Sequence, residues 1–128
     1  MLAALTVVGA MFVGCSISHQ TIEMSKLGPA NQIVVYDHGS PVSERVIAAG
    51  SDEDKAIAAW LQAHADGWQT DYHSYAPARF VRGTNYTLNF HKDRCILNYG
   101  TTDGGEWFQV SRPMNEGDTV PNIFTPSH

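Results

Sequence analysis

The amino-acid sequence predicts an α+β fold, an antiparallel sheet of about five to six strands with one helix packed on one face. Two observations predict it. Segments rich in β-branched and aromatic residues recur through residues 32–113 between turn-forming residues, and residues 52–66 alone have the spacing of an amphipathic helix. Because a helix of this length is marginal by itself in water, we expect its apolar side to pack across the sheet.

The predicted strands are short segments that end at turn-forming residues. Residues 32–36 are the first strand, and residues 42–49, whose alternation is only partial, are a weaker second. Residues 68–75 resume an aromatic, β-rich pattern and precede a proline at position 77, where a strand must end or lie at an edge. Residues 106–111 form the last predicted strand.

The helix is predicted by its start, its face and its end. Ser51 is the expected N-cap, Asp54 follows in the capping-box position, and the acidic run 52–54 suits the positive end of the helix dipole. Gly67 is the expected C-cap. One apolar face is predicted, made by Ile57, Trp60, Leu61 and His64.

Two segments around a polar break, 85–90 and 94–99, predict a hairpin with Lys92 and Asp93 at the centre of its turn. Its register places six side chains on one apolar face: Tyr86 opposite Tyr99, Leu88 opposite Leu97, and Phe90 opposite Cys95. A slip of one residue would exchange the two faces, so the pattern specifies the register. The opposite face is predicted to be mainly polar, with Thr87, Asn89, His91, Arg94, Ile96 and Asn98.

The N-terminal residues 2–14 form an uncharged apolar run with Thr6 as its only hydroxyl. Its length suits the apolar region of a secretory signal and is short for a bilayer-spanning helix of ~20 residues. The run ends in Phe12-Val13-Gly14-Cys15, which resembles the lipobox of bacterial lipoproteins. The resemblance implies cleavage before Cys15, acylation of that cysteine and, with Ser16 next, sorting to the outer membrane. The alternative is a buried N-terminal strand or helix with a free cysteine.

This interpretation divides the chain into four parts. Residues 1–14 are the signal peptide, 15–31 carry the lipidated Cys15 and a flexible tether, 32–113 form the α+β domain, and 114–128 are an irregular, poorly packed tail. Acyl chains would hold the protein on the membrane, facing the periplasm. Cys95 then has no intramolecular disulfide partner, and its strand-like surroundings favour a small buried hydrophobe over a reactive thiol.

The net charge and the absence of common catalytic motifs restrict the classes of function that the sequence supports. The net charge of −5 and the lack of a Lys/Arg cluster argue against a nucleic-acid partner. The sequence has no Gly-x-Ser-x-Gly elbow, no Gly-rich phosphate loop before a helix, and no close spacing of histidines. We therefore expect no cofactor and no metal, and a binding protein is favoured over an enzyme.

Large aromatic side chains and arginines, which are enriched at protein interfaces, supply the candidate binding surface. Its members are Trp68, Tyr72, Tyr75, Arg79, Arg82 and Trp107. The simpler alternative is that the aromatic residues complete the core, as we expect for at least two of the three tryptophans. The favoured function is a periplasmic protein-binding module, an inhibitor or an immunity factor.

The alternative function is a small periplasmic hydrolase or a ligand- or metal-binding protein that uses Asp71, His73 and His91. Asp71 and His73 lie two positions apart, so on a strand they would share a face and could hydrogen-bond. The competing interpretation is that these histidines are simply exposed or hydrogen-bonded.

Overall fold

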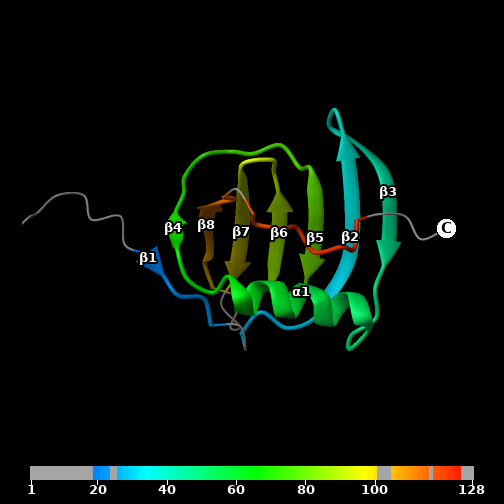
Figure 1. Ribbon diagram of the computed structural model, residues 1–128, viewed down its shortest axis with the longest axis horizontal. Coiled ribbons are helices and arrows are strands. Elements are labelled where there is room, and N and C mark those ends of the chain that lie inside the picture. The colour runs from blue at the N-terminus through cyan, green and yellow to red at the C-terminus, as the bar shows by residue number, and fades with distance from the viewer. Residues whose placement is uncertain (1–18, 24–25, 101–104, 116, 125–128) are drawn as a thin grey trace, which may run out of the picture.

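One antiparallel sheet and one helix make up the fold of this computed structural model, which describes residues 19–23, 26–100, 105–115 and 117–124. The elements are β1 (His19–Gln20), β2 (Ala30–Asp37), β3 (Ser40–Val46), α1 (Asp52–Ala63), β4 (Trp68–Thr70), β5 (Arg79–Gly83), β6 (Tyr86–Phe90), β7 (Arg94–Gly100) and β8 (Trp107–Pro113). The strand order is β1-β4-β8-β7-β6-β5-β2-β3, and α1 crosses one face of the sheet (Figure 1).

The predicted fold class is therefore correct, but the predicted number of strands is too low. The described residues form seven strands of at least three residues, together with the two-residue strand β1. The short strands β1 and β4 lie side by side at one edge of the sheet. Strand β4 covers only the first three residues of the predicted segment 68–75, and β1 was not predicted, because two residues carry almost no periodicity.

The hairpin of β6 and β7 has the predicted register. Tyr86 pairs with Tyr99, Leu88 with Leu97, and Phe90 with Cys95. The backbone N–H of His91 donates to the Arg94 carbonyl at 2.9 Å, which closes the turn around Lys92 and Asp93. The opposite face of the hairpin is partly covered rather than fully exposed to solvent, because Asn89 and Ile96 are both buried there.

The helix begins as predicted and ends earlier. The Ser51 side chain accepts a hydrogen bond from the Asp54 backbone N–H at 3.3 Å. The last helical residue is Ala63, three positions before the predicted end. The His64 carbonyl accepts from the Trp68 indole at 2.6 Å and from Arg112 Nη1 at 3.1 Å, so side chains satisfy the helix end that Gly67 was expected to cap.

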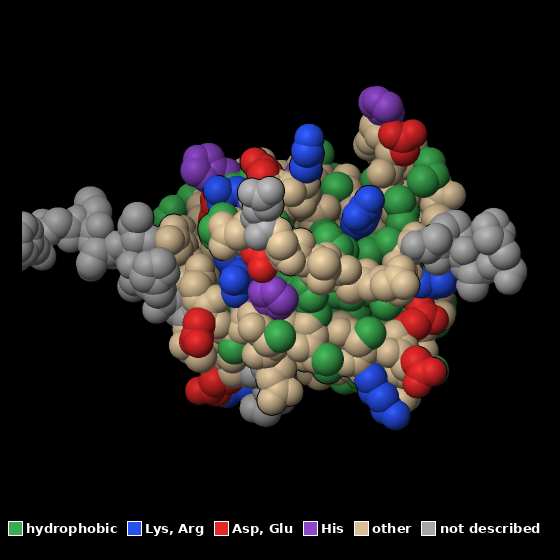
Figure 2. Space-filling model, viewed as in Figure 1, with side chains coloured by type: hydrophobic (Ala, Val, Ile, Leu, Met, Phe, Trp, Pro, Cys, Tyr) green, Lys and Arg blue, Asp and Glu red, His purple; other side chains and the backbone are tan. Residues whose placement is uncertain are grey.

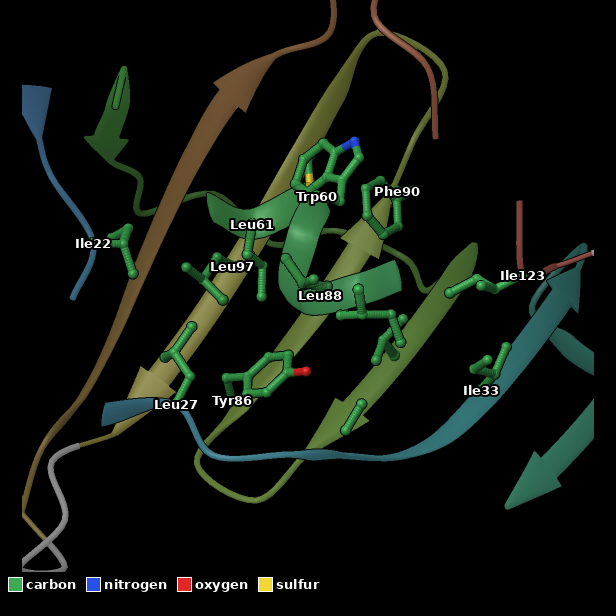
Figure 3. Close-up of a cluster of buried hydrophobic side chains, with 14 of the residues drawn as sticks. Ile22, Leu27, Ile33, Trp60, Leu61, Tyr86, Leu88, Phe90, Leu97 and Ile123 are labelled. Carbon is green, nitrogen blue, oxygen red and sulfur yellow. The ribbon is translucent and has the colours of Figure 1, made fainter. Parts of the chain in front are cut away.

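The core lies between α1 and the sheet. The helix buries the predicted Ile57, Trp60 and Leu61. The Trp60 ring meets the Phe90 ring edge to face, with centroids 4.8 Å apart (Figure 3). Further members of the core come from the strands and from both ends of the described chain: Ile22, Leu27, Ile33, Val81, Tyr86, Leu88, Leu97, Val110 and Ile123.

The expected tether is wrong over its described part. Ile22 and Leu27 are buried in the core, and β1 pairs with β4. The folded domain therefore begins well before residue 32. The predicted signal peptide and Cys15 lie outside the described residues. No helix within the described ranges has the length and apolar composition needed to cross a membrane.

The C-terminal segment is irregular as predicted, but its described part, residues 114–124 without 116, is well packed. Ile123 is buried, and the Phe124 ring lies with its centroid 5.6 Å from that of Phe90. The Trp60 indole donates to the Thr119 carbonyl at 2.8 Å, and the Arg45 guanidinium donates to the Ile123 carbonyl. The tail therefore covers the part of the sheet that α1 leaves open.

Candidate functional site

A buried carboxylate, that of Asp71, lies just after β4 and accepts hydrogen bonds from three directions. The Ser111 hydroxyl and the Tyr75 hydroxyl each donate to Oδ2 at 2.6 Å. The backbone N–H of His73 donates to Oδ1 at 2.8 Å, and His73 Nδ1 lies 2.8 Å from the same oxygen. Arg94 Nη1 lies 3.5 Å from Oδ2 and donates to Ser111 Oγ at 2.8 Å.

These contacts set the charge of the cluster. Burial disfavours the ionised form of Asp71, but hydrogen bonds from Ser111, Tyr75 and His73 outweigh it and hold the pKa of Asp71 well below its usual value. The same hydrogen bond from Tyr75 raises the pKa of its phenol. Asp71 is therefore an anion at neutral pH, and Tyr75 stays protonated as a donor.

The three residues of the predicted polar site lie in one neighbourhood. Asp71 contacts His73 directly, whereas the His91 ring lies beside the Tyr75 ring at a centroid distance of 5.7 Å. The predicted contact between Asp71 and His73 is confirmed, but its cause differs from the one expected. Strand β4 ends at Thr70, and the contact comes from a turn in which the Asp71 carboxylate bonds the backbone two residues on.

Buried and half-buried amides hold the connection from β4 to β5, residues 71–78, against the sheet. Asn89 Oδ1 accepts from the Ala78 N–H at 2.9 Å, and its Nδ2 donates to the Ala76 carbonyl at 3.0 Å. Gln109 Nε2 donates to the carbonyls of Asp71 and His73 at 3.0 and 2.6 Å. The sequence analysis did not assign Asn89, Gln109 or Ser111 to the site. The feature that could have indicated them is that each is a polar residue within a predicted strand.

Next to Asp71 and His73, a cavity of about 380 Å³ opens between the end of β4 and the beginning of β8. Three aromatic side chains with large exposed areas line it: Tyr72 is 94% exposed, Trp107 59% and Phe108 43%. We call this cavity the aromatic notch. Its other lining residues are Thr70, Asp71, His73, Ser74, Gln109 and Val110.

The structure brings together only part of the predicted binding surface. Tyr72 and Trp107 meet in the aromatic notch. Trp68 was wrongly placed on the surface, because it is fully buried and its indole caps the helix end. Arg82 extends over the ring of Phe80, at 5.1 Å from its centroid, and Arg79 lines a different cavity.

Two of the three tryptophans are buried in the core, as the alternative interpretation of the aromatic residues predicted. Trp60 and Trp68 are core residues, and only Trp107 is exposed. Cys95 is fully buried, and burial raises the pKa of its thiol well above the usual value. This confirms the interpretation of Cys95 as a buried hydrophobe rather than a reactive thiol.

The Asp71 cluster has the chemistry of a hydrogen-bonding and proton-exchanging site. The carboxylate holds one imidazole nitrogen of His73 and leaves the other available for a hydrogen bond, and the His73 side chain is 83% exposed. Ser111 donates to Asp71 rather than to His73. Within the described ranges, no group of three or more His, Cys, Asp or Glu residues is placed to hold a metal ion.

Comparisons with protein-family models, curated proteins and solved structures give no match to this chain.

Proposed function

We propose that this chain is a bacterial outer-membrane lipoprotein whose folded domain binds a protein partner in the periplasm through the aromatic notch, as an inhibitor or an immunity factor. The observation that carries the binding role is the gathering of exposed Tyr72, Trp107 and Phe108 around one cavity. Aromatic anchors of this kind dominate the energetics of protein interfaces. The anchoring role rests on the lipobox-like sequence that ends at Cys15.

The notch lies beside an open part of the sheet edge. Strand β4 pairs only with Val110 and Ser111 of β8, whereas β7 pairs along the whole of β8. Among the described residues, Trp107 and Phe108 thus have a partner strand on one side only. An extended segment of a partner can add its main chain here while its side chains enter the notch, which gives both affinity and specificity.

The binding role is tested by capturing periplasmic and secreted proteins on the immobilised protein and measuring the affinity of whatever is retained. Replacing Tyr72 and Trp107 by Ala should weaken that affinity at least about tenfold, because exposed aromatic anchors are typical hot spots. The matched control is Val46→Ala on β3 at the opposite edge, where the side chain is also strongly exposed. Equal weakening by Val46→Ala, or no effect of the aromatic pair, contradicts the assignment of the notch.

The anchor is tested separately. Cys15→Ser should abolish labelling of the protein by a radioactive or clickable fatty acid and should leave unprocessed precursor. The neighbouring substitution Ser16→Ala is the control and should retain both labelling and membrane association. Unchanged processing of the Cys15→Ser variant would remove the lipoprotein proposal without touching the notch.

A second function, binding or hydrolysis of a small polar molecule, is favoured by the 2.8 Å contact between Asp71 and His73 at the edge of the notch. Such a molecule would meet the free imidazole nitrogen of His73. Removing the imidazole with His73→Gln should then abolish small-molecule turnover or binding and leave the affinity for a protein partner largely intact. Equal loss of both would assign His73 to the protein interface instead.

A further inference from the structure

A second hollow, lined by different residues from those of the notch, lies along the C-terminal tail. The tail, orange to red in Figure 1, crosses the same face of the sheet as α1. Beside it lies a cavity of about 810 Å³, which we call the tail cavity. Figure 2 shows hydrophobic side chains gathered in this part of the surface, with Lys and Arg side chains standing among them. Its size falls in the range of ~300–1,000 Å³ typical of small-ligand sites.

The tail cavity has apolar walls. Phe90 is buried at the end of β6, and Val35 of β2 is half-buried. From the tail side, Met114 and Val120 pack against the hydrophobic core with part of their surface open. The remaining lining residues are Tyr36, Asp37, Val42, Ala78, Arg79, His91, Lys92, Asn115 and Asp118. An aliphatic chain that replaced water against these walls would gain hydrophobic free energy.

Two cations, Arg79 and Lys92, line the tail cavity together with two carboxylates, Asp37 and Asp118. Within the described part of the chain, neither Arg79 nor Lys92 forms an ion pair, and both are exposed. The two carboxylates at the cavity are already engaged. Asp37 Oδ1 lies 2.7 Å from His38 Nδ1, and Asp118 Oδ2 accepts from the Asn115 N–H at 2.7 Å.

The third titratable neighbour, His91, is engaged as well, since its Nε2 lies 2.7 Å from the Ala76 carbonyl. Asp37 and Asp118 each lie beside a histidine, whereas Arg79 and Lys92 have no ion-pair partner among the described residues, so these two cations are free to bind an added anion. Arg79 can bind a carboxylate through two parallel hydrogen bonds.

Smaller cavities lie beside the tail cavity, further along the C-terminal tail. Val35 lines two further cavities, of about 300 and 170 Å³, which also border Phe124. Arg79 lines the larger of the two. Val35 thus borders all three cavities beside the tail, and their linings mix apolar side chains with polar and charged ones.

We propose that the tail cavity binds a single-chain fatty-acid carboxylate, with the carboxylate on Arg79 and Lys92 and the chain along Val35 and the tail. Free cations beside an apolar space are complementary to an amphipathic anion. A neutral lipid would not pair with the cations, and a small inorganic anion would not displace water from the apolar side chains of the cavity. The proposal is independent of the notch, which lies between β4 and β8.

The test follows the methyl groups of the full chain by NMR in phosphatidylcholine nanodiscs during titration with octanoate. Saturable shifts should appear at Val35, Met114 and Val120, three of the methyl-bearing residues that line the cavity. Octanol has the chain without the charge, and propanoate has the charge without the chain. Both should bind at least about tenfold more weakly than octanoate, since each keeps only one half of the recognition.

Variants of the two cations complete the test. Arg79→Gln and Lys92→Gln should each weaken octanoate binding about tenfold, the loss expected for one charge-assisted hydrogen bond. The matched control is Arg82→Gln, because Arg82 is an exposed arginine on the same strand that lies outside the tail cavity. Absence of saturable shifts, equal binding of octanol, or full affinity in both the Arg79→Gln and Lys92→Gln variants would overturn the proposal.

Discussion

Ser111 donates a hydrogen bond of 2.6 Å to the buried carboxylate of Asp71, forty positions earlier in the chain. The bond joins the last strand of the sheet to the first residue after β4. Arg94 of β7 donates in turn to Ser111 Oγ. One carboxylate thus links three segments that are far apart in the sequence, and it also orients the only exposed histidine of the notch.

Asp71→Asn should destabilise the fold by roughly 2–4 kcal/mol, because the amide cannot accept every hydrogen bond that the carboxylate accepts and leaves Arg94 without its anion. Urea unfolding near neutral pH measures this loss. The matched control is Asp93→Asn in the exposed hairpin turn, which should change the free energy of unfolding by less than about 0.5 kcal/mol. Equal effects of the two substitutions would show that the Asp71 cluster is not a stabilising unit.

Stability should fall in acid, in part through Asp71. Its pKa in the folded protein lies below the ordinary 3.8, so between the two values the unfolded chain binds more protons. The contribution is therefore present above about pH 4 and is lost as the pH falls toward the folded pKa. Comparing the free energy of unfolding at about pH 5 and pH 2.5, the wild type should lose more than Asp71→Asn. Parallel curves would contradict the assignment.

Ile123→Ala should cost roughly 2–4 kcal/mol, since Ile123 is buried in the core although it lies near the end of the described chain. Thr119→Ala is the matched control within the tail. Thr119 is exposed, and the indole of Trp60 bonds its backbone carbonyl, which the substitution retains. A negligible cost for Ile123→Ala would mean that the tail does not contribute to the core.

The thiol of Cys95 should resist alkylation while the domain is folded. It is fully buried, and its raised pKa keeps the reactive thiolate scarce. Peptide mapping after iodoacetamide treatment should show at least about a hundredfold slower modification of Cys95 in buffer than in concentrated urea, because reaction requires opening of the core. Similar rates in both conditions would show that the sheet opens readily around β7.

The hairpin shows what the sequence predicts well. Its period-two alternation over β6 and β7 specified which residue pairs with which, and the observed pairs are the predicted ones. The start of α1 was likewise readable, because the Ser51 cap is a local interaction. The end of α1 was not, since the His64 carbonyl there also accepts from Arg112, which is distant in the sequence.

The site was predictable only where its residues are neighbours in the sequence. Asp71 and His73 are two positions apart, and their contact was anticipated. Ser111 and Asn89 enter through sheet registers that local patterning does not contain. Ile123 was missed for the same reason, because a lone apolar residue among polar ones carries no period, yet a tertiary contact buries it.

Under the proposal of an acylated Cys15, the pairing of β1 with β4 would limit how far the domain can stand from a membrane. If the anchor is at Cys15, only three residues lie between it and His19, and the four residue steps of a fully extended chain span at most about 14 Å. The β1 edge of the sheet would then stay close to the lipid surface. Strand β3 forms the opposite edge of the sheet. A partner in the notch would be held within reach of the bilayer.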